Sequence, residues 1–368
     1  MTNPLVRLGQ LGQSPWYDFI TRELIASGKL ARLISADGLR GMTSNPTIFE
    51  KAIAGSADYD DDIREAAARG KNSAEIFEIL AVADVRAACG AFHTVYRATD
   101  GVDGLVSLEV SPELANDTAG TVAEAKRLWA AVGKPNAMIK IPATPAGLPA
   151  ITDTLAAGIS VNVTLLFSVE RYQQVIEAFL AGLERRTARG LPVDRIRSVA
   201  SFFVSRVDGR IDPMLDRIGD PKGLRGTIAI ANAADAYDKF LRSLETDRWA
   251  ALASEGALPQ RPLWASTSTK DPKYPDTYYV EALIGPDTVN TLPPDTFEAY
   301  RDHGTPEPRI AAAMATACER LEALASVGID LAEVTRFLEE DGVKKFAASY
   351  RDLLAGIDAK STLLTSTR

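Results

Sequence analysis

Two short apolar segments, AMIKI (137–141) and ISVNVTLL (159–166), are separated by a longer stretch, residues 142–158. Short apolar runs that alternate with longer amphipathic segments are typical of a parallel α/β fold, in which the strands are buried and the connections are helical. The same alternation continues in both directions along the chain. It predicts strands at 16–20, 38–42, 104–110, 137–141, 159–166, 198–204, 262–266 and 288–292.

Eight strands with helical crossovers predict a closed (β/α)8 TIM barrel of the α/β class, because open sheets of this size are less common. A doubly wound open sheet is the alternative. Residues 208–262 are mostly helical in pattern, and we interpret them as an elaborated helical connection between strands 6 and 7. No Gly/Ser/Pro linker bounds this connection, so we expect a single domain over residues 1–368.

Three longer helical patterns complete the prediction. Residues 73–98 follow Asn72, a favourable N-cap, and residues 168–188 carry one apolar stripe. The C-terminal stretch 331–358 reads as two amphipathic helices broken at Gly342. We expect these C-terminal helices to lie over one barrel end.

Composition argues against several functions. The net charge of −8 makes a nucleic-acid partner a poor expectation, and no apolar run reaches about 18 residues, so no membrane partner is indicated. The N-terminus lacks a secretion pattern, and we expect a cytoplasmic protein. Two distant cysteines, Cys89 and Cys318, and two distant histidines, His93 and His303, cannot assemble a metal site. No dinucleotide-binding or P-loop motif is present, so a dinucleotide-binding or P-loop function lacks support.

Lys140 is the most informative polar residue, because it lies inside the apolar run AMIKIP (137–142). In barrels of this kind the chemistry is at the carboxyl ends of the strands. Burial favours the neutral amine of a lysine, and a neutral amine can attack a carbonyl carbon. The alternative is a structural ion pair, or a side chain that extends past the strand end to solvent.

Further polar residues stand in apolar strands. Asp18 and Glu109 occupy settings where an unpaired carboxylate is costly, and with a lysine they could supply the acid and base of Schiff-base chemistry. A buried ion pair is the alternative for each. Asn162 and Thr164 point to one face of their strand by alternation, which indicates a polar site or a ladder of internal hydrogen bonds.

Two groups of cations follow late strands. Arg206 and Arg210 come after the sixth predicted strand, and Lys270 and Lys273 come after the seventh, next to the hydroxyl-rich ASTST (265–269). Phosphate sites in barrels often use the loops after strands seven and eight. The pattern predicts a phosphate site, with a solvated basic surface as the alternative.

Six segments, in order along nearly the whole chain, resemble the transaldolase family and specifically its longer bacterial subgroup. They are GMTSNPTIFEKAI (41–53), SLEVSPELANDT (107–118), MIKIPAT (138–144), ISVNVTLLFS (159–168), SFFVSRVD (201–208) and ASTSTKDP (265–272). The resemblance implies a class I aldolase barrel, without metal or organic cofactor, in the non-oxidative pentose phosphate pathway. Its partners would be phosphorylated sugars, and we expect a monomer or a homodimer.

The implied reaction transfers a dihydroxyacetone unit from a ketose phosphate (sedoheptulose 7-phosphate or fructose 6-phosphate) to an aldose phosphate (glyceraldehyde 3-phosphate or erythrose 4-phosphate). Carried over by motif, the catalytic residues are Lys140 as the Schiff-base lysine, Asp18 as the acid/base for C–C cleavage, and Glu109, which acts with Thr164 and a water on the carbinolamine. The substrate-binding residues are Asn45, Asn162, Ser201 and Phe203 around the dihydroxyacetone unit, and Arg206 at the distal phosphate.

One position departs from the family pattern. Shorter relatives have a phosphate-binding arginine in an ASFRN-like stretch, and this chain has Ser268 there. Lys270 is the natural substitute, and Ser266 would contribute a hydroxyl.

Two other functions are alternatives. A related fructose-6-phosphate-type aldolase releases free dihydroxyacetone, but such relatives carry glutamine and tyrosine at the positions of Glu109 and Phe203. A non-catalytic sugar-phosphate-binding barrel would not need Lys140, Glu109 and Asp18 together.

Overall fold

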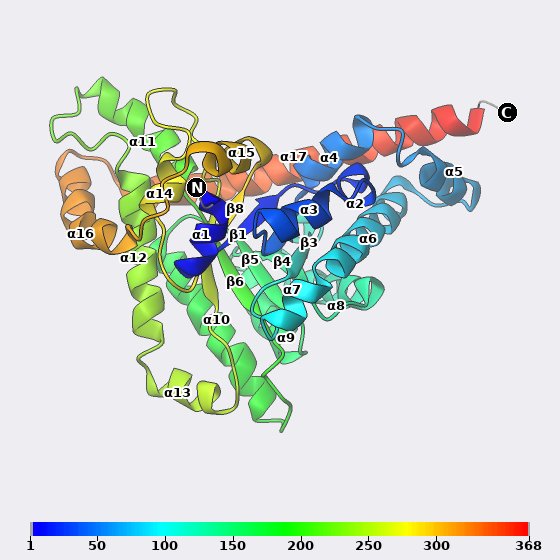
Figure 1. Ribbon diagram of the computed structural model, residues 1–368, viewed down its shortest axis with the longest axis horizontal. Helices are drawn as coiled ribbons and strands as arrows, with labels where there is room; N and C mark the ends of the chain where they lie inside the picture. The colour runs from blue at the N-terminus through cyan, green and yellow to red at the C-terminus, as the bar shows by residue number, and fades with distance from the viewer. Residues whose placement is uncertain (1–2, 367–368) are drawn as a thin grey trace.

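The computed structural model describes residues 3–366, and its centre is a closed barrel of eight parallel strands (Figure 1). Each strand pairs with the next one in the sequence, and β8 closes the barrel onto β1. All eight expected strands are present, so the (β/α)8 barrel is confirmed and the doubly wound sheet is excluded. The strands are β1 (Gln13–Asp18), β2 (Gly41–Thr43), β3 (Leu105–Glu109), β4 (Ala137–Pro142), β5 (Val161–Leu166), β6 (Ser198–Phe203), β7 (Arg261–Ala265) and β8 (Thr288–Leu292).

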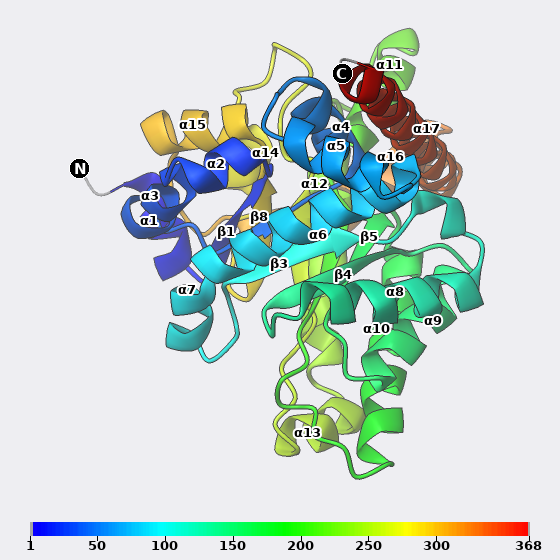
Figure 2. The ribbon, with the colours of Figure 1, turned by 90° about the vertical axis from the view of Figure 1, so that its right-hand side faces the viewer.

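Helices surround the barrel, as Figures 1 and 2 show. The expected helical connection between β6 and β7 is confirmed and contains α11, α12 and α13. The helices are α1 (Pro4–Gln10), α2 (Arg22–Ala26), α3 (Lys29–Ala36), α4 (Pro46–Ala54), α5 (Asp60–Ala68), α6 (Ser73–Ala91), α7 (His93–Ala98), η1 (Pro112–Leu114), α8 (Thr118–Val132), α9 (Gly147–Ala156), α10 (Val169–Thr187), α11 (Ser205–Arg217), α12 (Ile228–Ser243), α13 (Asp247–Ser254), α14 (Tyr278–Ala282), α15 (Pro294–His303), α16 (Ile310–Ser326) and α17 (Leu331–Ser366).

The register of β3, β4 and β5 places three polar residues at one level of the barrel. Ile139 and Ile141 of β4 are fully buried, and between them Lys140 pairs with Glu109 of β3 on one side and with Asn162 of β5 on the other. Since parallel strands share one direction, these residues lie near the same, carboxyl end of the barrel. Strand pairing therefore brings together residues that are distant in the sequence.

The first strand begins earlier than its apolar pattern indicates. The apolar run predicts 16–20, but β1 starts at Gln13, whose side chain is fully buried. Gln13 Nε2 donates to the carbonyl of Leu283 at 2.8 Å and to Thr288 Oγ1 at 3.0 Å. A polar side chain that is satisfied in this way can enter the core, and hydropathy alone does not reveal it.

The C-terminal prediction of two helices broken at Gly342 is wrong, because α17 runs without interruption from Leu331 to Ser366. A Cβ at position 342 would lie 3.1 Å from Leu165 Cδ2. Gly342 therefore allows α17 to approach β5 closely and does not end the helix. The helix does lie across one barrel end, as expected, and α13 lies at the opposite side (Figures 1 and 2).

The predicted helix 73–98 is interrupted once. Asn72 caps α6 through a hydrogen bond from Glu75 N, as expected, but α6 ends at Ala91 and α7 begins at His93. Phe92, between the two helices, has a fully buried ring. Gly90 has low helix propensity and weakens the last turn of α6.

Candidate active site

The carboxyl ends of the strands surround a cavity of ≈390 Å³, which we call the sugar cavity. The first turns of α4 and α11 and the loops after β7 and β8 contribute to its wall, and Phe346 of α17 covers part of it. All the predicted site residues except Glu109 and Asn162 line this cavity. The lining predicted residues are Asp18, Asn45, Lys140, Thr164, Ser201, Phe203, Arg206, Ser266 and Lys270.

Lys140 is only 4% exposed, and its ammonium group has few partners. Nζ donates to the carbonyl of Ser44 at 3.2 Å and lies 3.2 Å from Glu109 Oε2 in an ion pair. The ring of Phe346 is 5.7 Å away. The side chain ends in the sugar cavity, so it does not extend past the strand to bulk solvent.

Glu109 stands next to Lys140 and is equally buried, with 6% of its side chain exposed. Burial raises the pKa of Glu109 above its ordinary value; the Lys140 ammonium lowers it in part, and Asp18 raises it further. A carboxyl group in this setting holds its proton to a higher pH than a solvated one. Glu109 can therefore give a proton at a pH where an exposed glutamate is already ionised.

Asp18 ends β1 and faces the sugar cavity. Its Oδ1 accepts a hydrogen bond from Thr43 Oγ1 at 2.7 Å, and the Thr43 hydroxyl also lies 2.7 Å from that of Thr291. Burial raises the pKa of Asp18, while Lys140, the Thr43 hydroxyl and Arg206 lower it. The second carboxylate oxygen has no competing bond among the described residues, and it remains available to a substrate hydroxyl.

Two polar residues of β5 differ in their surroundings. Asn162 is fully buried behind the wall, where Nδ2 donates to Ser107 Oγ at 3.0 Å and Oδ1 accepts from Ser201 Oγ at 2.7 Å. Thr164 faces the cavity, and its buried Oγ1 has no hydrogen-bond partner in the described part of the chain. Directly after it, Leu165 has a φ of 58° where the register with β6 shifts. A strained residue at this point is consistent with a functional site.

Asn45 has a structural contact as well as a place in the cavity wall. It is the N-cap of α4, and its Oδ1 accepts from Ile48 N at 3.0 Å. Its amide nitrogen has no partner in the described structure, which leaves a donor for a substrate hydroxyl. The helix cap thus fixes the side chain at the wall.

The phosphate end of the cavity has an arginine without an ion-pair partner among residues 3–366. The Arg206 guanidinium lies 4.9 Å from the ring centroid of Phe203, and burial lowers the pKa of Arg206, with Asp341 and Asp18 acting in the opposite sense. A desolvated guanidinium in this position is suited to hold an anion.

The loop after β7 supplies the remaining groups. Ser266 has a φ of 56°, and its hydroxyl lies 3.1 Å from that of Ser205. Lys270 is exposed, and its Nζ donates to Ser268 Oγ at 2.8 Å. Ser268, at the position where the resemblance implies an arginine, and Lys270, the predicted substitute, are therefore in contact with each other in the cavity wall.

Sequence reasoning missed Lys51, which lines the cavity from α4. Lys51 lies in the motif 41–53, fewer than two helical turns after the Asn45 cap. Its closeness to Asn45 along the helix was the signal in the sequence that could have identified it. In contrast, Arg210 is not in the cavity wall, because its guanidinium stacks 4.3 Å from the ring of Phe337. Lys273 also lies outside the wall.

Two kinds of feature are absent from the part of the chain that the structure describes. Between residues 3 and 366, no cluster of three or more histidine, cysteine or acidic residues could hold a metal ion. Within the same range, no helix has the length and apolar character needed to span a membrane. Cys89 is buried and Cys318 is exposed, and they form no disulfide.

Comparison with known proteins gives matches over nearly the full length. Residues 15–357 match a family model described as transaldolase/fructose-6-phosphate aldolase. A transaldolase of Acidothermus cellulolyticus is 52% identical over 359 residues, which covers 97% of this chain and 96% of that protein. A transaldolase of Thermobifida fusca is 50% identical over 357 residues (96% and 97%), and one of Trichodesmium erythraeum is 45% identical over 377 residues (99% of each).

Proposed function

The chain belongs to the transaldolase/fructose-6-phosphate aldolase family, and from this premise we propose how its residues carry out the transaldolase reaction. The enzyme transfers a dihydroxyacetone unit from a ketose phosphate to an aldose phosphate through a lysine Schiff base, a reaction of the non-oxidative pentose phosphate pathway. The observation that carries the assignment of residues is the burial of Lys140 beside Glu109, at the floor of a cavity that also contains Asp18.

Lys140 and Glu109 form the imine. The neutral amine of Lys140 attacks C2 of the ketose, and the proton it loses moves to the former carbonyl oxygen to give a carbinolamine. Transfer of a proton from the Lys140 ammonium to Glu109 within their ion pair gives the neutral amine and the protonated acid, and burial of Glu109, which raises its pKa, favours this transfer. Glu109 then donates this proton to the hydroxyl that departs as water, and the nitrogen lone pair forms the C=N bond. The unpartnered Thr164 hydroxyl supports this step by positioning the water.

Asp18 breaks the carbon–carbon bond. As a carboxylate it removes the proton of the C4 hydroxyl, the C3–C4 electron pair moves into the imine to form an enamine, and the aldose phosphate leaves. The enamine then attacks the aldehyde carbon of the acceptor, and Asp18 returns its proton to the new hydroxyl. The Thr43 hydrogen bond holds the carboxylate in place through both steps.

The substrate is held at both ends. Asn45 and Ser201 bind hydroxyls of the dihydroxyacetone unit, with Asn162 fixing Ser201 from behind and Phe203 packing beside the chain. The distal phosphate is held by three further residues. They are Arg206, Ser266 and Lys270.

The remaining expectations stand as part of the proposal. We propose that residues 1–368 act as one domain, because α17 from the C-terminal part covers the cavity formed by the barrel. We propose that the enzyme acts in the cytoplasm. The assembly is proposed to be a monomer or a homodimer.

The test is reduction of the imine. With fructose 6-phosphate and borohydride the enzyme should lose activity irreversibly and gain a reduced three-carbon unit on Lys140, which peptide mass spectrometry locates. Lys140→Ala should show neither adduct nor turnover, while Lys126→Ala, at an exposed lysine of α8, should behave as the unmodified enzyme. An adduct on a different lysine contradicts the assignment.

A second measurement separates transfer from simple aldol cleavage. With erythrose 4-phosphate present, the dihydroxyacetone unit should appear in sedoheptulose 7-phosphate and not as free dihydroxyacetone. The presence of Glu109 and Phe203 supports this outcome. Predominant release of free dihydroxyacetone would favour the aldolase alternative.

A further inference from the structure

A second, smaller cavity of ≈30 Å³ lies beside Glu109, and we call it the side chamber. Its walls come from the start of α4, from α6, from β3 and η1, from α8, and from Tyr350 of α17. Most of the wall is apolar, as at Phe49 and Phe77, but Glu109 and Glu124 also face it. A cavity of this size has room for about two water molecules.

Glu109 lines the side chamber and not the sugar cavity. Its Oε2 is buried and accepts no hydrogen bond, although Lys140 Nζ lies 3.2 Å away. The Lys140 ammonium compensates the charge of this carboxylate, but its Oε2 still lacks a hydrogen bond, and water in the side chamber would supply one. The residues that stand between the two cavities are Ser44, whose carbonyl accepts from Lys140, and Asn45, which lines both.

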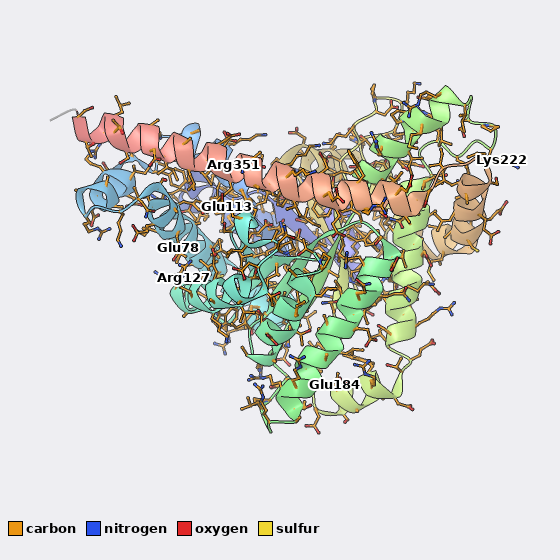
Figure 3. The ribbon with its side chains drawn as sticks, turned by 180° about the vertical axis from the view of Figure 1, so that it is seen from behind. Glu78, Glu113, Arg127, Glu184, Lys222 and Arg351 are labelled. Atoms are coloured by element: carbon orange, nitrogen blue, oxygen red, sulfur yellow. The ribbon has the colours of Figure 1, made fainter. Side chains whose placement is uncertain are left out.

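A second carboxylate stands where the side chamber approaches the surface. Glu124 Oε1 accepts from Ser111 N at 3.2 Å, and 19% of its side chain is exposed. Burial raises the pKa of Glu124, while Ser111 N–H and Arg127 lower it and Glu78 raises it. Figure 3 shows Glu78 and Arg127 side by side on this face, below α17, and the two form an ion pair.

We propose that the side chamber binds water and carries protons between solvent and Glu109 by way of Glu124, separately from the entrance used by the sugar. The inference rests on the proposed Schiff-base role of Lys140. When the carbinolamine C–O bond breaks, Glu109 gives its proton to the leaving hydroxyl, so the products are water, an iminium ion and the Glu109 carboxylate. Because the ketose phosphate occupies the sugar cavity at this moment, the proposed exit for the water is the side chamber.

The same route restores Glu109. A chamber water donates a proton to the Glu109 carboxylate and takes one from Glu124, which in turn exchanges with solvent at the rim. The charged groups that face the route are Lys140 and Asp18 at the inner end, and Arg127 and Glu78 at the outer end. Hydrolysis of the imine uses the route in the opposite direction.

The experiment measures the rate at which ¹⁸O from labelled water enters C2 of fructose 6-phosphate, with no acceptor added and the uncatalysed exchange subtracted. Glu124→Gln keeps an acceptor for Ser111 N–H but cannot relay a proton. Ala74→Leu enlarges an exposed residue that lines the chamber from α6 and narrows it. The matched control is Ala87→Leu, the same change at an exposed α6 position outside the chamber wall.

We expect Glu124→Gln and Ala74→Leu to slow the exchange by roughly tenfold or more, as for loss of an acid/base contribution. The KM for fructose 6-phosphate and the yield of the borohydride adduct at equilibrium should not change, and Ala87→Leu should match the unmodified enzyme.

Three outcomes would overturn the route. If the unmodified enzyme and the three variants exchange ¹⁸O at the same rate, with normal adduct yield, the proposed route is wrong and the role of Lys140 is unaffected. A rise in KM that matches the fall in exchange would mean that the substitutions distort the sugar cavity instead. Absence of any adduct in the unmodified enzyme refutes the Schiff-base assignment itself and the route with it.

Discussion

The two ends of the sugar cavity are built in different ways. At the lysine end, Asp18, Glu109 and Lys140 stand on barrel strands, and the pairing of Glu109 with Lys140 fixes their relative height. At the phosphate end, Arg206 lies in the first turn of α11 and Lys270 is exposed in the loop after β7. The sheet positions the groups that we propose to make and break bonds, whereas helix and loop contacts position the groups that we propose to hold the anion.

The phosphate end is held together by side chains in place of a sheet. Tyr274 OH donates to Asp212 of α11 at 2.7 Å, and Arg225 forms ion pairs with both Asp216 and Asp271. These contacts tie the loop after β7 to α11 and to the loop that follows it. Substitutions at the lysine end should therefore change the rate of the chemical steps, and substitutions at the phosphate end should change substrate binding.

The largest effect should come from Asp18→Asn at the lysine end. The amide cannot accept the C4 hydroxyl proton, so we expect turnover to fall by about 10²–10⁴-fold. Imine formation should persist, because Lys140 and Glu109 are unchanged. Borohydride should then trap the complete six-carbon ketose phosphate on Lys140, where the unmodified enzyme yields a three-carbon unit, and mass spectrometry distinguishes the two.

Glu109→Gln is the matched comparison, because it removes a proton donor from the imine steps and leaves Asp18 in place. It should slow the appearance of any adduct, and the adduct that does form should be the three-carbon unit. Near-normal turnover in Asp18→Asn would show that a different residue is the base. It would contradict the proposal that residues on the barrel strands make and break the bonds.

The contrast between the two ends also explains what the sequence could predict. All eight strands were found from apolar runs, and a charged residue inside such a run, as at Lys140, is conspicuous because burial there has a high cost. The uninterrupted α17 could not be predicted. Whether Gly342 breaks a helix or permits close packing depends on Leu165, which is distant in the sequence.

Loop residues carry weaker signals. The sequence indicated four cations for the predicted phosphate site, but Arg210 stacks on Phe337 and Lys273 lies outside the cavity. The sequence prediction also did not include Lys51 of α4, which lines the cavity. Along a strand, successive side chains point to alternate faces, so their direction can be predicted, but no comparable rule predicts the direction of a side chain in a loop. The sequence also could not predict that Glu109 lines the side chamber, because the walls of this chamber come in part from α6 and α8.

An intermediate effect is expected from removing the phosphate cations. Arg206 is half-buried and can hold a phosphate with two parallel hydrogen bonds, whereas Lys270 is exposed and acts as a point charge. A charge-assisted hydrogen bond contributes about 1.5–3 kcal/mol, so Arg206→Ala should lower kcat/KM for fructose 6-phosphate by roughly 10- to 100-fold, and Lys270→Ala by less.

Unphosphorylated fructose provides the control for these variants, because it offers no anion and should be used equally well by all of them. Lys273→Ala, outside the cavity wall, should match the unmodified enzyme with both sugars. An unchanged KM for fructose 6-phosphate in Lys270→Ala would show that this lysine is a solvated rim residue, and that Arg206 holds the phosphate without it.

The smallest effect on catalysis is expected from Asp208→Asn, which addresses the support of α11. Asp208 is 1% exposed; it accepts from Ala229 N at 2.7 Å and from Tyr279 OH at 3.0 Å. Burial raises the pKa of Asp208 to about 7, and the nearby Asp212 contributes to the rise. Asparagine preserves the shape of the protonated side chain and can accept from Ala229 N through its amide oxygen.

The consequence is a pH-dependent difference in stability. Since the pKa of Asp208 is higher in the folded state than the ordinary value of 3.8, its stabilising contribution is complete below about pH 4 and is lost as the pH rises through 7. The free energy of unfolding of Asp208→Asn, measured relative to the unmodified enzyme, should therefore increase from pH 5 to pH 8, by roughly 3 kcal/mol at most. Urea unfolding at several pH values measures it.

If this support serves only the phosphate end, KM for fructose 6-phosphate should change a few-fold while the rate with fructose stays constant. A stability difference that does not vary with pH would mean that Asp208 is ionised throughout this range, and α11 would then be anchored by a buried carboxylate and not by a neutral acid.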